Sequence, residues 1–201
     1  MNGPDTADET SFYFDYELQV DATRDAVAKL AREVLQYEWA DYLRASPPAG
    51  AHAWHALDSG RPWGRVTPAA WERGRDSGYD LHFEHYPTPR ALERGQFRLE
   101  LHLEDGVHGD ADFSGDSPYA ALRDRLVAAL DEARDEHDDL PSGEFGTGRT
   151  LWRVDSHFLA GDTVAYYEAL REALSAHDPF VDAVAAVLEG ELPDCDPFER
   201  D

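Results

Sequence analysis

The chain has 201 residues, and its hydrophobic fraction of 42% is enough for one domain with a sizeable core. Its 42 acidic residues against 18 basic ones give a formal net charge of −24 and a sequence pI near 4.5. The single cysteine, Cys195, excludes an intrachain disulfide and a metal site built from several thiolates.

Strong acidity with a single lysine, Lys29, is typical of proteins from a high-salt cytoplasm such as that of haloarchaea, where salt screens the self-repulsion. The sequence has no signal-like start and no apolar stretch of membrane-spanning length. We therefore expect a cytoplasmic protein of a halophile proteome that has no membrane partner.

Changes in the spacing of apolar residues predict the secondary structure of the first part of the chain. Residues 1–10 are polar and are predicted to be a disordered tail. Residues 11–20 alternate between apolar and polar side chains, which predicts a first strand, and residues 21–44 show helical spacing. Residues 47–78 are predicted to be an irregular insert rich in Trp and Arg, with one short helix beginning after Thr67.

The stretch from Tyr79 to Glu104 predicts a β-hairpin with a long connection, because both arms alternate with period two. The apolar face of the arms carries Leu81, Phe83, Phe97, Leu99, Leu101 and Leu103. The opposite face carries Asp80, His82, Glu84, Arg98, Glu100, His102 and Glu104.

The remaining residues predict three more helices and one strand. Ser117 begins a helix that ends near residue 137, and residues 150–158 alternate as a strand. Asp162 caps a further helix, and another runs from residue 178 to residue 190. Residues 191–201 are predicted to be a flexible acidic tail.

The predicted order indicates an α+β domain over residues 11–190, with a four-stranded antiparallel sheet that carries helices on one face. This order resembles the ferredoxin-like βαββαβ topology over residues 11–158, followed by two additional C-terminal helices. That topology hosts many unrelated activities, so it assigns no function.

The charged face of the sheet is the first candidate site. His82, Glu84, Glu100, His102 and Asp155 could converge on a divalent metal ion if the hairpin register places the two histidines opposite each other. The simpler interpretation, which we favour from the sequence, is a solvated face of an acidic protein.

The second candidate is the Trp- and Arg-containing insert. Arg61, Arg65, Arg73 and Arg75 could bind an anion, either a nucleotide or a single strand of nucleic acid. The alternative is that the tryptophans fill the core and the arginines pair with neighbouring acids.

A non-enzymatic binding or protein-interaction module is the preferred functional hypothesis, because no catalytic motif is found. Its partner would be another protein or a second copy of the chain, contacted through the C-terminal helices among other surfaces. The alternatives are a metal-dependent hydrolase that uses the charged face and a nucleotide- or nucleic-acid-binding protein that uses the insert. Nucleic acid is the less favoured partner, and no cofactor other than a divalent metal ion is expected.

Overall fold

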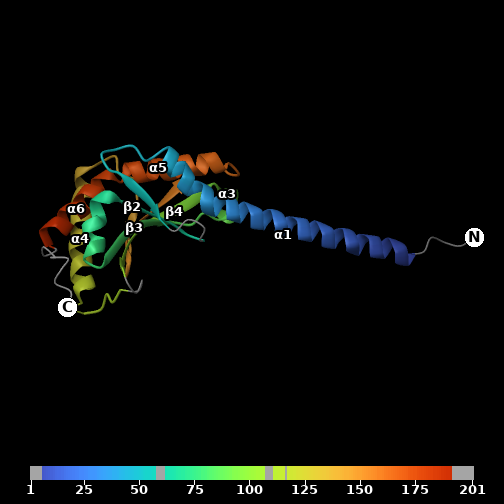
Figure 1. Ribbon diagram of the computed structural model, residues 1–201, viewed down its shortest axis with the longest axis horizontal. Helices are drawn as coiled ribbons and strands as arrows, with labels where there is room; N and C mark the ends of the chain where they lie inside the picture. The colour runs from blue at the N-terminus through green and yellow to red at the C-terminus, as the bar shows by residue number, and fades with distance from the viewer. Residues whose placement is uncertain (1–5, 58–61, 107–110, 116, 192–201) are drawn as a thin grey trace, which may run out of the picture.

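The computed structural model describes residues 6–57, 62–106, 111–115 and 117–191. It is an α+β fold in which an antiparallel sheet with strand order β1-β2-β3-β4-β6-β5 packs helices on one face (Figure 1). The strands are β1 (Trp54–Leu57), β2 (Gly64–Pro68), β3 (Tyr79–His85), β4 (Gln96–Asp105), β5 (Glu144–Phe145) and β6 (Thr150–His157). The helices are α1 (Thr6–Ala45), η1 (Ala69–Trp71), α2 (Glu72–Asp76), α3 (Pro89–Arg94), α4 (Pro118–Glu136), α5 (Thr163–Ala176) and α6 (Asp178–Glu191).

The expected four-stranded ferredoxin-like topology is not confirmed, because the sheet has six strands. Residues 11–20, predicted as the first strand, belong instead to the long helix α1, which extends away from the body of the protein (Figure 1). A strand needs a neighbouring sheet edge for its backbone hydrogen bonds, whereas a helix satisfies those bonds internally. A segment that leaves the body can therefore be helical despite its alternating pattern.

The segment 47–78, expected to be irregular, supplies two strands of the sheet. β1 pairs antiparallel with β2, and β2 pairs antiparallel with β3. These strands are only four and five residues long, too short for a clear alternation. Of the tails predicted at 1–10 and 191–201, residues 1–5 and 192–201 lie outside the described residues, whereas residues 6–10 belong to α1 and Glu191 is the last residue of α6.

The predicted hairpin is present, with a short helix as its connection. β3 and β4 pair antiparallel over their whole overlap, from Tyr79 opposite Asp105 to His85 opposite Leu99. The side chain of Thr88 accepts a hydrogen bond from the backbone N–H of Ala91 and caps α3. Gly95 ends the helix in the left-handed conformation that glycine adopts without strain.

A β-bulge lies beside the middle of the hairpin. The register between β4 and β6 shifts between Leu101 and His102, so that Leu101 lies opposite Trp152 and His102 lies opposite Thr150. Leu151 is the extra residue, and both Leu151 and Trp152 belong to the hydrophobic core. The bulge thus adds a second large side chain to the core at this point of β6.

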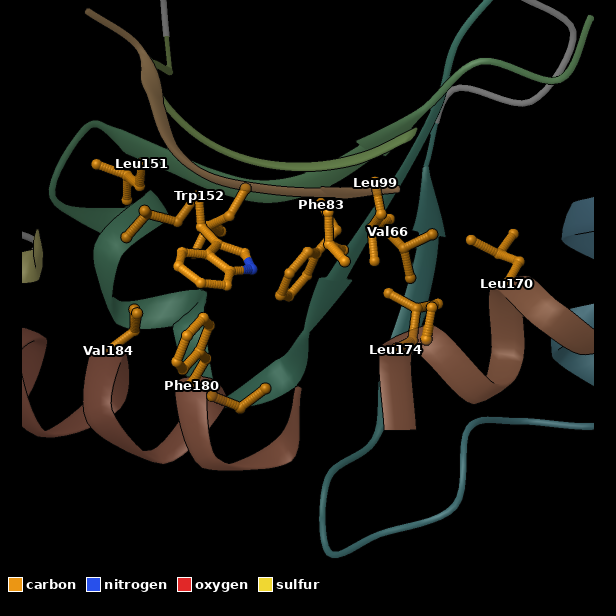
Figure 2. Packing of buried hydrophobic residues seen from close by; sticks show 14 of the residues in the cluster. Val66, Phe83, Leu99, Leu151, Trp152, Leu170, Leu174, Phe180 and Val184 are labelled. Atoms are coloured by element: carbon orange, nitrogen blue, oxygen red, sulfur yellow. The ribbon is translucent and has the colours of Figure 1, made fainter. Parts of the chain in front are cut away.

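The core lies between the sheet and the helices α5 and α6, and α1 and α4 also contribute buried residues to it. Figure 2 shows Phe83 and Trp152 of the sheet above Phe180 of α6, and Val66 above Leu174 of α5. The apolar face predicted for the hairpin is confirmed, since all of its members are buried: Leu81, Phe83, Phe97, Leu99, Leu101 and Leu103.

The helices predicted in the second half of the chain are confirmed together with their caps. Ser117 caps α4 by accepting a hydrogen bond from the backbone of Ala120, and Asp162 caps α5 through the backbone of Val164. Among the described residues, no helix is both long enough and apolar enough to cross a membrane.

Candidate metal centre

His82 and His102 lie directly opposite each other on the central strand pair, which is the arrangement that a shared metal ion requires. Both side chains are fully buried. The charged face was expected to be solvated, and over these positions that expectation is wrong. Strand pairing places neighbouring long side chains beside the two imidazoles, and these side chains exclude water from them.

Glu84 and Glu104 complete a group of four buried residues with the two histidines. One ligand atom from each of the four lies within 4.8 Å of all the others. Glu84 Oε2 is 3.8 Å from His82 Nε2 and 3.7 Å from His102 Nδ1. We call His82, Glu84, His102 and Glu104 the donor cluster.

The spacing within the donor cluster is too long for hydrogen bonds. Both ring nitrogens of His82 and both of His102 are buried with no hydrogen-bond partner among the described residues. Donor atoms bound to one tetrahedral metal ion at ~2.1 Å are separated by ~3.4 Å. The separations of 3.8 and 3.7 Å between Glu84 Oε2 and the two ring nitrogens are close to that edge length, and an ion bound among these atoms would satisfy one nitrogen of each ring.

The ring nitrogens that point away from Glu84 face carboxylates. His82 Nδ1 is 3.4 Å from Asp80 Oδ1, and His102 Nε2 is 3.4 Å from Glu100 Oε2. A carboxylate behind a histidine is the usual support of a metal ligand, because it fixes the tautomer and the orientation of the ring. The same pattern on both sides makes His82 Nε2 and His102 Nδ1 the nitrogens available to an ion.

Side chains that surround the donor cluster donate hydrogen bonds to its two carboxylates, Glu84 and Glu104. The Tyr86 hydroxyl donates a hydrogen bond to Glu84 Oε1, which leaves Oε2 directed at the histidines. Arg65 donates to Glu104 Oε2 at 2.6 Å, and Arg149 donates to Glu104 Oε1 at 2.6 Å. Each oxygen of Glu104 keeps a second lone pair that remains able to bind a cation.

The charges around the donor cluster do not balance when both histidines are neutral. Asp80, Glu84, Glu100 and Glu104 contribute four negative charges, and the guanidiniums of Arg65 and Arg149 contribute two positive ones. The remaining charge of about −2 is balanced either by one divalent cation or by two protonated imidazoles, and buried charges require such compensation.

Neighbouring groups shift the pKa values of Glu84 and His102 in opposite directions. Burial would raise the pKa of Glu84, but the adjacent His102 and His82 imidazoles and the hydrogen bond from Tyr86 outweigh it and hold that pKa far below its usual range. Burial would lower the pKa of His102, but the carboxylates of Glu100 and Glu84 outweigh it and raise that pKa. An ion bound here would therefore replace a proton on His102.

Of the metal ligands predicted from the sequence, the structure brings together His82, Glu84 and His102. Glu100 stands behind His102 as a supporting carboxylate. Asp155 is not in the donor cluster, because it pairs with Arg98 at 2.9 Å on an exposed part of β6. Glu104 was assigned to the charged face but not to the ligands, although its position two residues beyond His102 on the same strand was a usable signal.

Two of the four arginines of the predicted anion site, Arg65 and Arg75, lie with their side chains in the described part of the structure. Arg65 is engaged with Asp80 and Glu104, and Arg75 is exposed on α2. Arg61 and the side chain of Arg73 lie outside the described part of the structure. The ion pairs of Arg65 agree with the alternative in which the insert's arginines neutralise neighbouring acids.

Comparison of the chain with protein-family models, with curated proteins and with solved structures finds no match in any of the three.

Proposed function

We propose that this chain is a metal-binding protein that holds one divalent transition-metal ion in the donor cluster. The observation that carries the proposal is the set of buried, hydrogen-bond-free ring nitrogens that flank Glu84 Oε2. Leaving such polar atoms buried without partners costs about 1–3 kcal/mol each, and coordination would recover that cost.

The donor types favour particular ions. Two imidazole nitrogens with two carboxylates suit Zn²⁺, Mn²⁺, Fe²⁺, Co²⁺ or Ni²⁺, whereas Ca²⁺ and Mg²⁺ prefer shells made of oxygen atoms. No thiolate is present in the donor cluster that would select a softer ion.

The enclosure of the donor cluster favours a non-enzymatic role. A catalytic ion keeps an open position for water or substrate, while a structural ion is enclosed by protein ligands. Here all four donors come from β3 and β4 and are buried. The ion would link the two central strands and stabilise the domain as a binding or protein-interaction module.

The test is metal analysis of the purified protein and calorimetric titration of the protein after chelation, both in molar KCl. We expect one ion per chain for the wild type, and loss of binding for His102→Ala and Glu84→Gln. His157→Ala is the matched control, because His157 is exposed on β6 and should not affect binding. A wild-type protein that takes up none of the transition metals would refute the proposal.

Hydrolysis at the same ion is the second candidate, and one pocket favours it. A pocket of about 390 Å³ is bordered by Tyr86 and Glu100, which contact the donor cluster, and by Arg90 and Arg94 of α3. Arginines at its rim would suit a phosphate ester. Turnover of p-nitrophenyl phosphate by the zinc- or manganese-loaded protein, reduced in Arg90→Gln and Arg94→Gln, would establish this role, and no turnover above buffer would exclude it.

We further propose that the protein works in the reducing, high-salt cytoplasm of a halophile. The support is compositional: a net charge of −24, one lysine and one cysteine in 201 residues. Charge of this density is tolerable where molar salt screens it.

A further inference from the structure

The first half of α1 stands apart from the body of the protein (Figure 1). Near its C-terminal end the helix packs one face on the body, and this face consists of Leu35, Trp39, Ala40 and Leu43, all buried. Residues 16–26 are exposed throughout. A helical segment exposed to water over this length is only marginally stable, because most helix stability in proteins comes from packing.

The sequence of α1 contains a heptad repeat. Its members recur at alternating intervals of three and four residues: Tyr13, Tyr16, Val20, Thr23, Val27, Leu30, Val34 and Tyr37. An interval that averages 3.5 residues over more than three heptads is the pattern of a coiled coil, since it keeps one narrow stripe facing a partner helix. We call these eight residues the heptad seam.

The heptad seam lies on the side of α1 opposite the body. At 100° per residue, Tyr37 is about 200° around the helix from both Leu35 and Trp39, and its side chain is 56% exposed where theirs are buried. Toward the N-terminal end of the seam, Val20 is 39% exposed and Tyr16 is 61% exposed. The seam positions whose side chains the structure describes, Tyr16, Val20, Thr23 and Tyr37, are therefore all exposed and none packs into the protein's own core.

We infer that the occupant of the heptad seam is α1 of a second copy of this chain, paired as an antiparallel coiled coil. A 3.5-residue stripe about 37 Å long requires an equally long, straight partner. The next longest described helix, α4, has 19 residues and already packs on the body with Leu122, Leu126 and Leu130. Among the helices that the structure describes, only another α1 has the matching length and spacing.

The antiparallel orientation follows from the seam and from the charge. When residues whose numbers add to 50 lie side by side, Tyr13 meets Tyr37, Val20 meets Leu30 and Thr23 meets Val27, so every seam position has a partner. This arrangement places the two bodies at opposite ends of the paired helices. Because each chain carries a net charge of −24, separating the bodies reduces their repulsion.

The first measurement is the mass of the full-length protein by light scattering in molar KCl. We expect a dimer for the wild type and a monomer for the double variant Val20→Asp, Leu30→Asp. Leu18→Asp is the matched control, because Leu18 is 67% exposed but lies outside the heptad seam. This control should remain dimeric.

Circular dichroism and tryptophan fluorescence distinguish loss of the α1 pairing from unfolding of the whole protein. The monomeric double variant should lose helix signal from α1 while the fluorescence of the buried core tryptophans, such as Trp152, stays native. A monomeric wild type would overturn the inference, and so would a Leu18→Asp variant that dissociates as readily as the double variant.

The orientation is tested with engineered cysteines in a Cys195→Ser background. Val20→Cys together with Leu30→Cys should form an interchain disulfide on oxidation, because these positions adjoin in the antiparallel pair. Val20→Cys alone should not, since the two copies of residue 20 would be about 15 Å apart along the axis. Efficient cross-linking by Val20→Cys alone would overturn the antiparallel arrangement.

Discussion

His82 and His102 face one another across β3 and β4 with their ring centroids 5.7 Å apart and their planes at 78°. In this edge-to-face arrangement one nitrogen of each ring lies within 4 Å of the same oxygen, Glu84 Oε2. A pair of histidines that only filled space would not need to converge on a carboxylate.

The convergence predicts ion selectivity. After chelation, Zn²⁺, Mn²⁺ or Co²⁺ should raise the melting temperature of the wild type, whereas Ca²⁺ and Mg²⁺ should not, because the site offers two imidazoles. An ion at a hundred times its dissociation constant stabilises by about 2.7 kcal/mol, which corresponds to roughly 5–10 °C for a chain of this size. Differential scanning fluorimetry would measure it, and an equal response to Ca²⁺ would contradict it.

The ion pairs of Glu104 and Asp155 should differ in their contribution to stability. Glu104 is 2% exposed and accepts hydrogen bonds from Arg65 and Arg149, so Glu104→Gln weakens two charge-assisted hydrogen bonds to a buried side chain and should cost about 3 kcal/mol. The Asp155 side chain is 41% exposed in its pair with Arg98, so Asp155→Asn should cost at most about 1 kcal/mol. Urea denaturation in EDTA at fixed KCl removes any contribution of metal, and equal losses would refute the distinction.

Stability should fall in mild acid because of His177. Trp152 Nε1 lies 3.2 Å from His177 Nε2, and His177 Nδ1 lies 2.6 Å from the carbonyl oxygen of Ala173, so the buried ring accepts from the indole and donates to the carbonyl as a neutral imidazole. Burial lowers its pKa to about 4. An unfolded histidine titrates near 6.5, so the unfolded chain takes up the proton first as the pH falls, and stability is lost between about pH 6.5 and 4.

The measurement is the free energy of unfolding at pH 7 and pH 5. His177 alone should account for about 2 kcal/mol of the loss over this interval. His177→Gln should therefore show a shallower pH dependence than the wild type, whatever its stability at pH 7. His157→Gln, at an exposed position, should keep the wild-type slope. Parallel slopes for all three proteins would show that His177 is not the titrating group.

Potassium chloride should stabilise the fold. The net charge of −24 is screened over ~10 Å at 0.1 M salt and over ~3 Å at 1 M, so repulsion weakens steeply in this range. We expect the melting temperature to rise with KCl, and to rise much less with sucrose at equal osmolarity. Similar rises in both would assign the effect to solvent exclusion instead of charge.

The sequence identified the central hairpin and its two faces because each arm alternates between apolar and polar side chains over at least six residues. Whether His82 faced His102 depended on the register, which is fixed by the connection through α3 and cannot be read from the alternation alone. The burial of the charged face could not be predicted from the sequence either. It depends on where the side chains of Arg65, Tyr86 and Arg149 extend once the strands have paired.

The N-terminal segment shows how two periods can coexist in one stretch. Residues 11–20 alternate as a strand would, yet Tyr13, Tyr16 and Val20 also begin a repeat that continues to Tyr37. A ten-residue window favours the strand, while a longer window that includes Val34 favours the helix. The two strands within 47–78 were missed for the opposite reason, because each is too short to establish any period.

The strands at the two sides of the sheet are its shortest, with four residues in β1 and two in β5. An edge strand has unpaired backbone N–H and C=O groups with which another chain can extend the sheet. A short edge strand has few such groups. In concentrated salt, where apolar association is strengthened, this limits the templates available for aggregation. Copies of the chain would then meet through side chains on a helix, in a complex of fixed size, and not through an open-ended addition of strands.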